Sequence, residues 1–204
     1  MKCSSFTRDD VEVLNDTSAY DGFFKVRELQ LRHRKFDGSW SPTLRRELVL
    51  RHDAVGVLLY DPRRDEIALV EQFRVGAMKR SSNPWLLELV AGLIDSDEDA
   101  EQVARREAVE EAGCAVNEME LICEYFSSPG GNNEYFYLYC GHCDLQNAGG
   151  VFGLPEEGED IRVHVLPIDE AMQRLQRGEM HNAHTIIALQ WLQLHRQRLR
   201  EQWR

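Results

Sequence analysis

The sequence predicts an α+β protein, because strand patterns dominate its first half, a capped helix follows, and two helices close the chain. A chain of 204 residues is slightly longer than one ordinary domain, and 43% hydrophobic residues supply a core. The connections are mostly short and no internal repeat is visible. We therefore expect one compact domain over residues 52–204, preceded by an accessory antiparallel strand layer over residues 1–51.

The strand predictions rest on alternating or continuous apolar runs bounded by turn residues. Residues 23–31 alternate, and Asp37-Gly38 is typical of the hairpin turn that follows such a strand. Further strands are predicted at 48–50, 54–60, 66–74, 121–126, 134–140 and 161–165.

The first predicted helix covers residues 98–112. Asp95, Ser96 and Asp97 offer oxygens to its free N–H groups, and Gly113 is a typical helix end. Two more helices are predicted over 168–178 and 182–203.

The charge balance limits the partners of the chain. Lys and Arg number 24 against 35 Asp and Glu, a net charge of −11, whereas proteins that bind nucleic acids or anionic membranes present a basic face. The first ten residues contain no apolar run, and no stretch approaches the roughly 20 apolar residues that cross a bilayer. We expect a soluble, cytoplasmic protein that binds neither nucleic acid nor membranes.

The cysteines indicate no redox function. Five cysteines in a chain without an export signal are expected to be reduced thiols. Cys140 and Cys143 form a C-x-x-C pair, but the pair ends a predicted strand and no helical pattern follows. A redox pair needs its first thiolate at the beginning of a helix, so we interpret the two as strand-end residues.

The first predicted helix carries Glu107, Glu110 and Glu111, which fall within about a third of its circumference. Glu107 and Glu111 share an arc with the small apolar residues Ala100, Val103, Ala104 and Ala108. Like charges at this spacing repel. Arg106 or a hard divalent cation such as Mg²⁺ or Mn²⁺ could offset the repulsion. From the three glutamates alone, an ordinary helix with an acidic stripe is an equally good interpretation.

The spacing around these glutamates is more specific. From Gly92 to Cys114 the chain reads G-x5-E-x7-R-E-U-x-E-E-x-G-U, where U is a bulky apolar residue. Ala108 and Cys114 are smaller than usual at the two U positions. Seven fixed positions would arise by chance about once in a million such chains. This motif is the Nudix box, and the chain therefore resembles the Nudix hydrolases.

From about Tyr20 onward the chain is similar to the bacterial ADP-ribose pyrophosphatases of that family. Pro129, fifteen residues after the box, and the segments 85–92 and 157–164 match that subfamily. The resemblance implies an α/β/α Nudix sandwich and a homodimer that exchanges its N-terminal β layer. It also implies hydrolysis of ADP-ribose to AMP and ribose 5-phosphate with Mg²⁺, or alternatively Mn²⁺.

The resemblance further implies the roles of individual residues. Glu107 and Glu111 would bind metal beside Glu110, completed by the Ala91 carbonyl and Glu159, and Arg106 would orient the glutamates. Glu157 matches the loop residue that acts as general base, although Glu156 and Glu159 in the same loop stay open for this role. The implied substrate contacts are Arg51, Arg74, Leu93, Ser128, Pro129, Gly130 and Glu134. The partner subunit would add Phe23, Phe24, Arg46 and Glu47, with the aromatic rings stacking on adenine.

Two alternatives remain at this point. The chain could hydrolyse another nucleotide sugar such as GDP-mannose, or it could be a non-catalytic ADP-ribose sensor. The complete Nudix box argues against the sensor.

Overall fold

The computed structural model describes residues 6–95, 97–154 and 158–203. Two compact units result, one from Met1–Asp53 with Phe126–Tyr135 and one from Ala54–Tyr125 with Phe136–Arg204. The first unit contains the elements η1 (Arg8–Asp10), β1 (Val11–Asp21), β2 (Lys25–His33) and β3 (Leu44–Leu50). The second contains β4 (Asp53–Asp61), β5 (Glu66–Phe73), η2 (Val75–Ala77), β6 (Trp85–Glu88), β7 (Val90–Ile94), α1 (Ala100–Ala112), β8 (Met119–Phe126), β9 (Tyr135–His142), β10 (Gly150–Phe152), β11 (Ile161–Pro167), α2 (Ile168–Gln176) and α3 (Ala183–Gln202).

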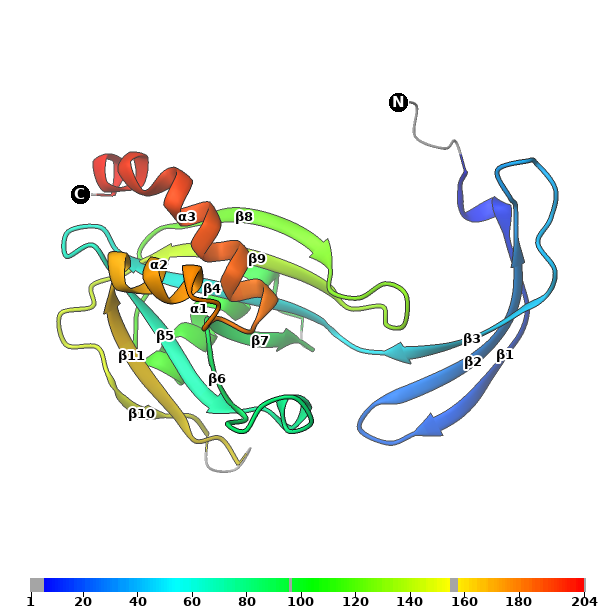
Figure 1. The fold of residues 1–204 in the computed structure, drawn as a ribbon, viewed down its shortest axis with the longest axis horizontal. Coiled ribbons are helices and arrows are strands. Elements are labelled where there is room, and N and C mark those ends of the chain that lie inside the picture. The colour runs from blue at the N-terminus through cyan, green and yellow to red at the C-terminus, as the bar shows by residue number, and fades with distance from the viewer. Residues whose placement is uncertain (1–5, 96, 155–157, 204) are drawn as a thin grey trace. The chain divides into compact units, whose positions relative to one another are not determined.

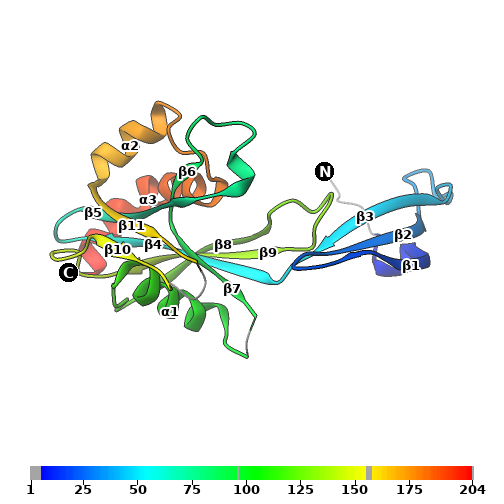
Figure 2. The same cartoon turned by 90° about the horizontal axis from the view of Figure 1, so that it is seen from below.

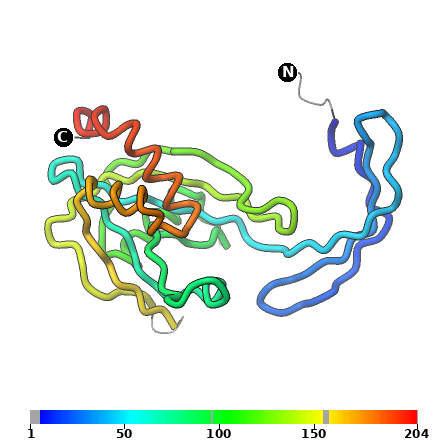
Figure 3. Tube along the Cα trace, viewed as in Figure 1, coloured from blue at the N-terminus to red at the C-terminus, as the bar shows by residue number. Residues whose placement is uncertain are grey.

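The first unit is an antiparallel sheet in the order β1-β2-β3, whose chain path can be followed in Figure 3. β1 was not predicted, because its polar middle, residues 15–18, lacks the alternation that marks a strand. Its pairing with β2 is accompanied by an ion pair of 2.7 Å between Arg27 and Asp16. β2 begins at Lys25 rather than at residue 23, because Phe23 and Phe24 lie in the turn after β1.

The tip of the β8–β9 hairpin belongs to this first unit. The Val49 N–H donates to the Gly131 carbonyl at 2.9 Å. The Asn133 side chain accepts from the Arg51 N–H at 2.7 Å and donates to the Arg51 carbonyl at 3.0 Å. The end of β3 and residues far along the sequence are thus joined by hydrogen bonds that local sequence patterns do not indicate.

The second unit is built on a sheet in the order β10-β11-β5-β4-β9-β8, with β6 beside β5 and β7 beside β4 (Figure 1). β4 pairs antiparallel with β5 and parallel with β9. The predicted strands after residue 52 are all present. β6, β7 and β10 have only three to five residues each, which is too short for a periodicity to be recognised.

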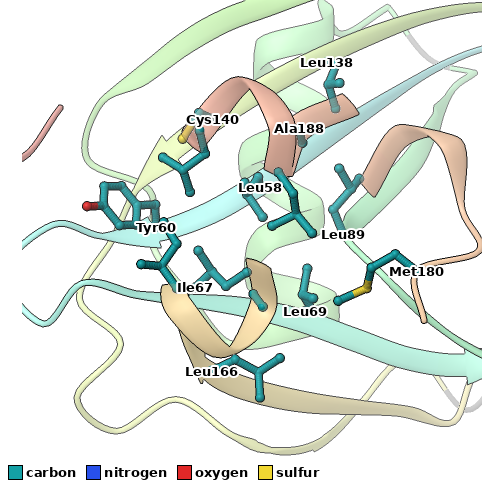
Figure 4. Close-up of a cluster of buried hydrophobic side chains, with 14 of the residues drawn as sticks. Leu58, Tyr60, Ile67, Leu69, Leu89, Leu138, Cys140, Leu166, Met180 and Ala188 are labelled. Carbon is teal, nitrogen blue, oxygen red and sulfur yellow. The ribbon is translucent and has the colours of Figure 1, made fainter. Parts of the chain in front are cut away.

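Helices cover both faces of this sheet, with α1 on one side and α2 and α3 on the other (Figure 2). Side chains of β4 alternate between the two cores, because successive strand residues point to opposite faces. Val57 packs in the cluster that contains residues of α1, whereas Leu58 and Tyr60 pack in the cluster under α2 and α3, drawn in Figure 4. The predicted α/β/α arrangement is confirmed.

The helix ends differ slightly from the prediction. α1 begins at Ala100 rather than at residue 98, because Asp99 is its N-cap. The Asp99 carboxylate accepts from the Gln102 N–H at 2.8 Å, and the Gln102 side chain accepts from the Asp99 N–H at 2.9 Å. Gly113 ends the helix as predicted, with a left-handed φ of 64°. None of the helices in the described ranges is long and apolar enough to cross a membrane.

Candidate active site

Two glutamates of α1 face β7. Glu111 is only 3% exposed, and its Oε2 accepts from the Ala91 N–H at 3.1 Å. Glu107 lies so close to Gly92 that a Cβ at that position would be 2.1 Å from its Oε1. A side chain at position 92 would therefore displace the Glu107 carboxylate from its present place. The prediction that Glu111 lies on the apolar arc of the helix is confirmed by the burial of its neighbours Val103, Ala104 and Ala108.

Arg106 connects the glutamates of the box. Its Nη1 lies 2.9 Å from Glu107 and 2.8 Å from Glu110, and its Nε lies 3.2 Å from Glu98. Although partial burial acts in the opposite direction, the charges of Glu107 and Glu110 raise the pKa of Arg106. Glu98 was not predicted to contact Arg106, although its fixed position in the box was a signal for such a contact.

The site contains more negative than positive charge. Burial raises the pKa of Glu111 to about 8, and the charges of Glu107 and Glu159 act in the same direction, whereas the Ala91 N–H and Arg74 oppose them. Burial also raises the pKa of Glu107 against the influence of Arg106. The acids that these contacts and charges bring together are Glu98, Glu107, Glu110, Glu111 and Glu159.

Glu159 approaches this group from the segment after β10. Its Oε2 accepts from the Leu154 N–H at 3.0 Å, and its own N–H donates to the Leu154 carbonyl at 3.3 Å. Glu156 and Glu157, the other candidates for the general base, lie outside the described residues. The predicted base is therefore not located.

The donor set suits a hard divalent cation. Within the described ranges no three acids, histidines or cysteines are arranged to hold a metal ion. In this structure Glu107 and Glu110 contact Arg106, and Glu111 contacts the Ala91 N–H. Carboxylate oxygens are nevertheless the ligands that Mg²⁺ and Mn²⁺ prefer. Glu107, Glu111 and Glu159, whose charges act on one another, are the residues that could hold such an ion.

Two predicted substrate residues belong to the same unit as these acids. Arg74 follows β5, and its Nε donates to Glu88 at 2.7 Å. Its charge acts on the Glu111 carboxylate, which indicates that the two are close. Leu93 of β7 is partly buried against the core under α2 and α3.

Other predicted substrate residues come together in the first unit. Arg51 forms a 3.0 Å ion pair with the buried Glu134, and its guanidinium lies 5.4 Å from the centre of the Phe24 ring. Phe23 contacts Phe24 edge to face at 5.0 Å and is 88% exposed. An exposed aromatic pair beside an arginine could stack on a base and bind a phosphate.

The remaining predicted contacts are exposed residues of the same unit. Arg46 and Glu47 lie on β3, where Arg46 donates to the Arg45 carbonyl at 2.8 Å. Ser128, Pro129 and Gly130 lie in the hairpin tip. Their contact with substrate stays a prediction.

The C-x-x-C pair lies where the sequence analysis expected it. Cys140 is fully buried in β9, and Cys143 is buried directly after the strand. Burial raises the pKa of the Cys140 thiol, which is the opposite of what a redox-active thiolate requires.

A protein-family model described as "NUDIX domain" matches residues 50–189. The chain is 45% identical over 199 residues to an ADP-ribose pyrophosphatase of Escherichia coli (strain K12), covering 98% of this chain and 95% of that protein. It is 34% identical over 191 residues to a GDP-mannose pyrophosphatase of Cronobacter sakazakii, covering 91% and 96%.

A crystal structure of an ADP compounds hydrolase superposes with a TM-score of 0.69 at 20% identity, covering 97% of this chain and 98% of the other, and shares its fold. The family match includes the whole glutamate-bearing motif from Gly92 to Cys114. The chain belongs to the Nudix family.

Proposed function

We propose that this protein hydrolyses the diphosphate bond of ADP-ribose to AMP and ribose 5-phosphate with the aid of Mg²⁺ or Mn²⁺. The proposal rests on the group of buried and half-buried carboxylates around Glu111. Their negative charge exceeds the positive charge near them. The choice of substrate is supported by the 45% identity to the E. coli ADP-ribose pyrophosphatase.

The chemistry fits these residue types. A diphosphate is an anion that a cluster of glutamates would repel, and a bound divalent ion supplies the neutralising charge and acidifies water. Glu107, Glu111 and Glu159 would hold the ion, with Glu110 and the Ala91 carbonyl beside them. Arg106 keeps the box glutamates oriented through its ion pairs. A loop carboxylate, for which Glu157 is our first candidate, takes the proton of the attacking water.

The N-terminal unit, with a boundary after residue 51, contributes the nucleotide contacts in this proposal. Phe23 and Phe24 stack on adenine from the partner subunit of a homodimer that exchanges this layer. The exposure of both rings and the adjacent guanidinium of Arg51 support that role. We further propose that the enzyme acts in the cytoplasm, where its buried free thiols would stay reduced.

The direct test is product analysis after incubation with Mg²⁺ and ADP-ribose, ADP-glucose or GDP-mannose. We expect AMP and ribose 5-phosphate, with ADP-ribose hydrolysed fastest. Preference for GDP-mannose, which the 34% identity to a GDP-mannose pyrophosphatase makes the second candidate, would contradict the adenine-stacking role of Phe23 and Phe24. Saturable ADP-ribose binding without any AMP would favour the sensor instead. Hydrolysis in H₂¹⁸O would show which phosphorus is attacked.

A further inference from the structure

A buried carboxylate outside the Nudix box contacts Arg74. Glu88, the last residue of β6, is only 4% exposed, whereas the Arg74 side chain is 44% exposed. The two meet at 2.7 Å through Glu88 Oε2 and Arg74 Nε. Within the described ranges Glu88 is the one hydrogen-bond partner of the Arg74 side chain. An arginine held through Nε keeps its two Nη groups available for another anion.

The other oxygen of Glu88 is bound as well. Asn182, the N-cap of α3, donates from Nδ2 to Glu88 Oε1 at 2.8 Å. The Asn182 Oδ1 accepts from the Thr185 N–H at 3.2 Å, so both ends of its amide are occupied. The Thr185 hydroxyl in turn accepts from the Leu89 N–H at 3.0 Å. The start of α3 is therefore tied to the last residue of β6 and to Leu89, the single residue between β6 and β7.

This arrangement lies beside the catalytic glutamates. β7 begins two residues after Glu88 and carries the Ala91 N–H that binds Glu111. The charge of Arg74 reaches Glu111 as well. Burying the Glu88 carboxylate costs free energy unless hydrogen-bond donors compensate for the lost water. Here the donors are one charged group, Arg74, and one neutral group, Asn182.

We propose that Glu88 is a positioning residue that holds the Arg74 guanidinium toward an anionic oxygen of the substrate, and that Asn182 fixes Glu88 for this task. The inference rests on the proposed hydrolysis of a nucleotide sugar. Glu88 does not touch the substrate; it acts through Arg74.

The test uses steady-state kinetics on the nucleotide sugar that the wild-type enzyme hydrolyses, expected to be ADP-ribose. Glu88→Gln should raise KM about tenfold with kcat changed little, because an amide at this position cannot accept both hydrogen bonds. Arg74→Ala should raise KM similarly, and the double variant should be no worse than Arg74→Ala alone. The matched control is Glu71→Gln on β5, where the carboxylate pairs with His164 at 2.9 Å and points to the opposite face; its KM should stay unchanged.

A rescue separates positioning from a loss of stability. Asn182→Asp alone places two carboxylates face to face and should also raise KM. Combining Glu88→Gln with Asn182→Asp reverses donor and acceptor, keeps a good N-cap, and should recover most of the lost affinity. If Glu88→Gln does not fold, Asn182→Ser, which keeps the cap but removes the donor to Glu88, should raise KM about threefold.

An unchanged KM in Glu88→Gln, or effects of Glu88→Gln and Arg74→Ala that multiply in the double variant, would overturn this inference while leaving the proposed function intact. Absence of hydrolysis by the wild-type protein would instead overturn the proposed function.

Discussion

A half-buried and a buried acid of the same unit, Asp65 and Glu111, meet opposite electrostatic environments. Asp65, in the turn between β4 and β5, accepts from the Tyr60 hydroxyl at 2.8 Å and pairs with Arg196 and Arg200 of α3. Burial alone would raise its pKa, but the hydrogen bonds from Arg196 and Tyr60 and the arginine charges hold the pKa of Asp65 below its usual value. Burial raises the pKa of Glu111, in contrast, to about 8.

In the proposed function, this difference separates a structural acid, Asp65, from a metal-binding one, Glu111. The negative charge at Asp65 is neutralised inside the protein, so that this turn needs nothing further. At Glu111 the described residues provide one backbone N–H and the charge of Arg74, while neighbouring carboxylates add repulsion. Such an imbalance persists in native proteins where a ligand compensates it, and the proposed function assigns a divalent cation as that ligand.

The largest effect is expected from Glu111→Gln. The amide oxygen can still accept from the Ala91 N–H, but the charge that attracts the cation is gone, so kcat should fall about 10³-fold or more. Glu101→Gln is a matched control, because Glu101 lies on the same helix, is exposed and pairs only at the surface with Arg105. Turnover of Glu111→Gln near the wild-type rate in saturating Mg²⁺ would contradict the assignment of Glu111 as a metal-binding residue.

Asp65→Asn, in contrast to Glu111→Gln, should lower the free energy of unfolding and leave the activity unchanged. It leaves Arg196 and Arg200 without their shared carboxylate, and loss of one partner of such a half-buried pair costs about 1–2 kcal/mol of unfolding free energy. Urea denaturation measures this loss, and kcat/KM for the same protein should be unchanged. A fall in kcat/KM without a loss of stability would show that this turn is not purely structural.

The pH dependence of stability sharpens the comparison. The pKa of Glu111 is raised from 4.5 to about 8, so the folded state binds this proton more tightly than the unfolded state. In EDTA, the unfolding free energy of the wild type relative to Glu111→Gln should therefore fall between about pH 5 and pH 8, by about 1–3 kcal/mol. Saturating Mg²⁺ should abolish the fall.

Asp65 has the opposite sign. Its lowered pKa contributes stability above the ordinary value of 3.8, which is lost as the pH falls below it. If the unfolding free energies of the wild type and of Glu111→Gln changed equally between pH 5 and pH 8, the assignment of the raised pKa to Glu111 would be contradicted.

The sequence predicts the fold where patterns are long. The apolar runs at 54–60 and 66–74 and the three helices are found within two residues of their predicted ends. β1 has a polar middle and β6, β7 and β10 are short, so these strands exist mainly because neighbouring strands complete their hydrogen bonds.

The site is predictable to a similar degree. The spacing from Gly92 to Cys114 places Glu107 and Glu111 on the buried arc and Arg106 among the box glutamates, and the structure has them there. The contact between Glu88 and Asn182 joins residues 94 positions apart, and nothing local in either segment indicates it.

The most direct test of the central claim is a titration of the substrate-free protein with Mn²⁺ at pH 7.5. Electron paramagnetic resonance of the unbound ion measures how much Mn²⁺ is bound. We predict saturable binding to the wild type, unchanged binding to Asp65→Asn, and binding at least about tenfold weaker to Glu111→Gln. Equal Mn²⁺ affinity of the wild type and Glu111→Gln would contradict the claim that the uncompensated carboxylates of α1 exist to bind a divalent cation.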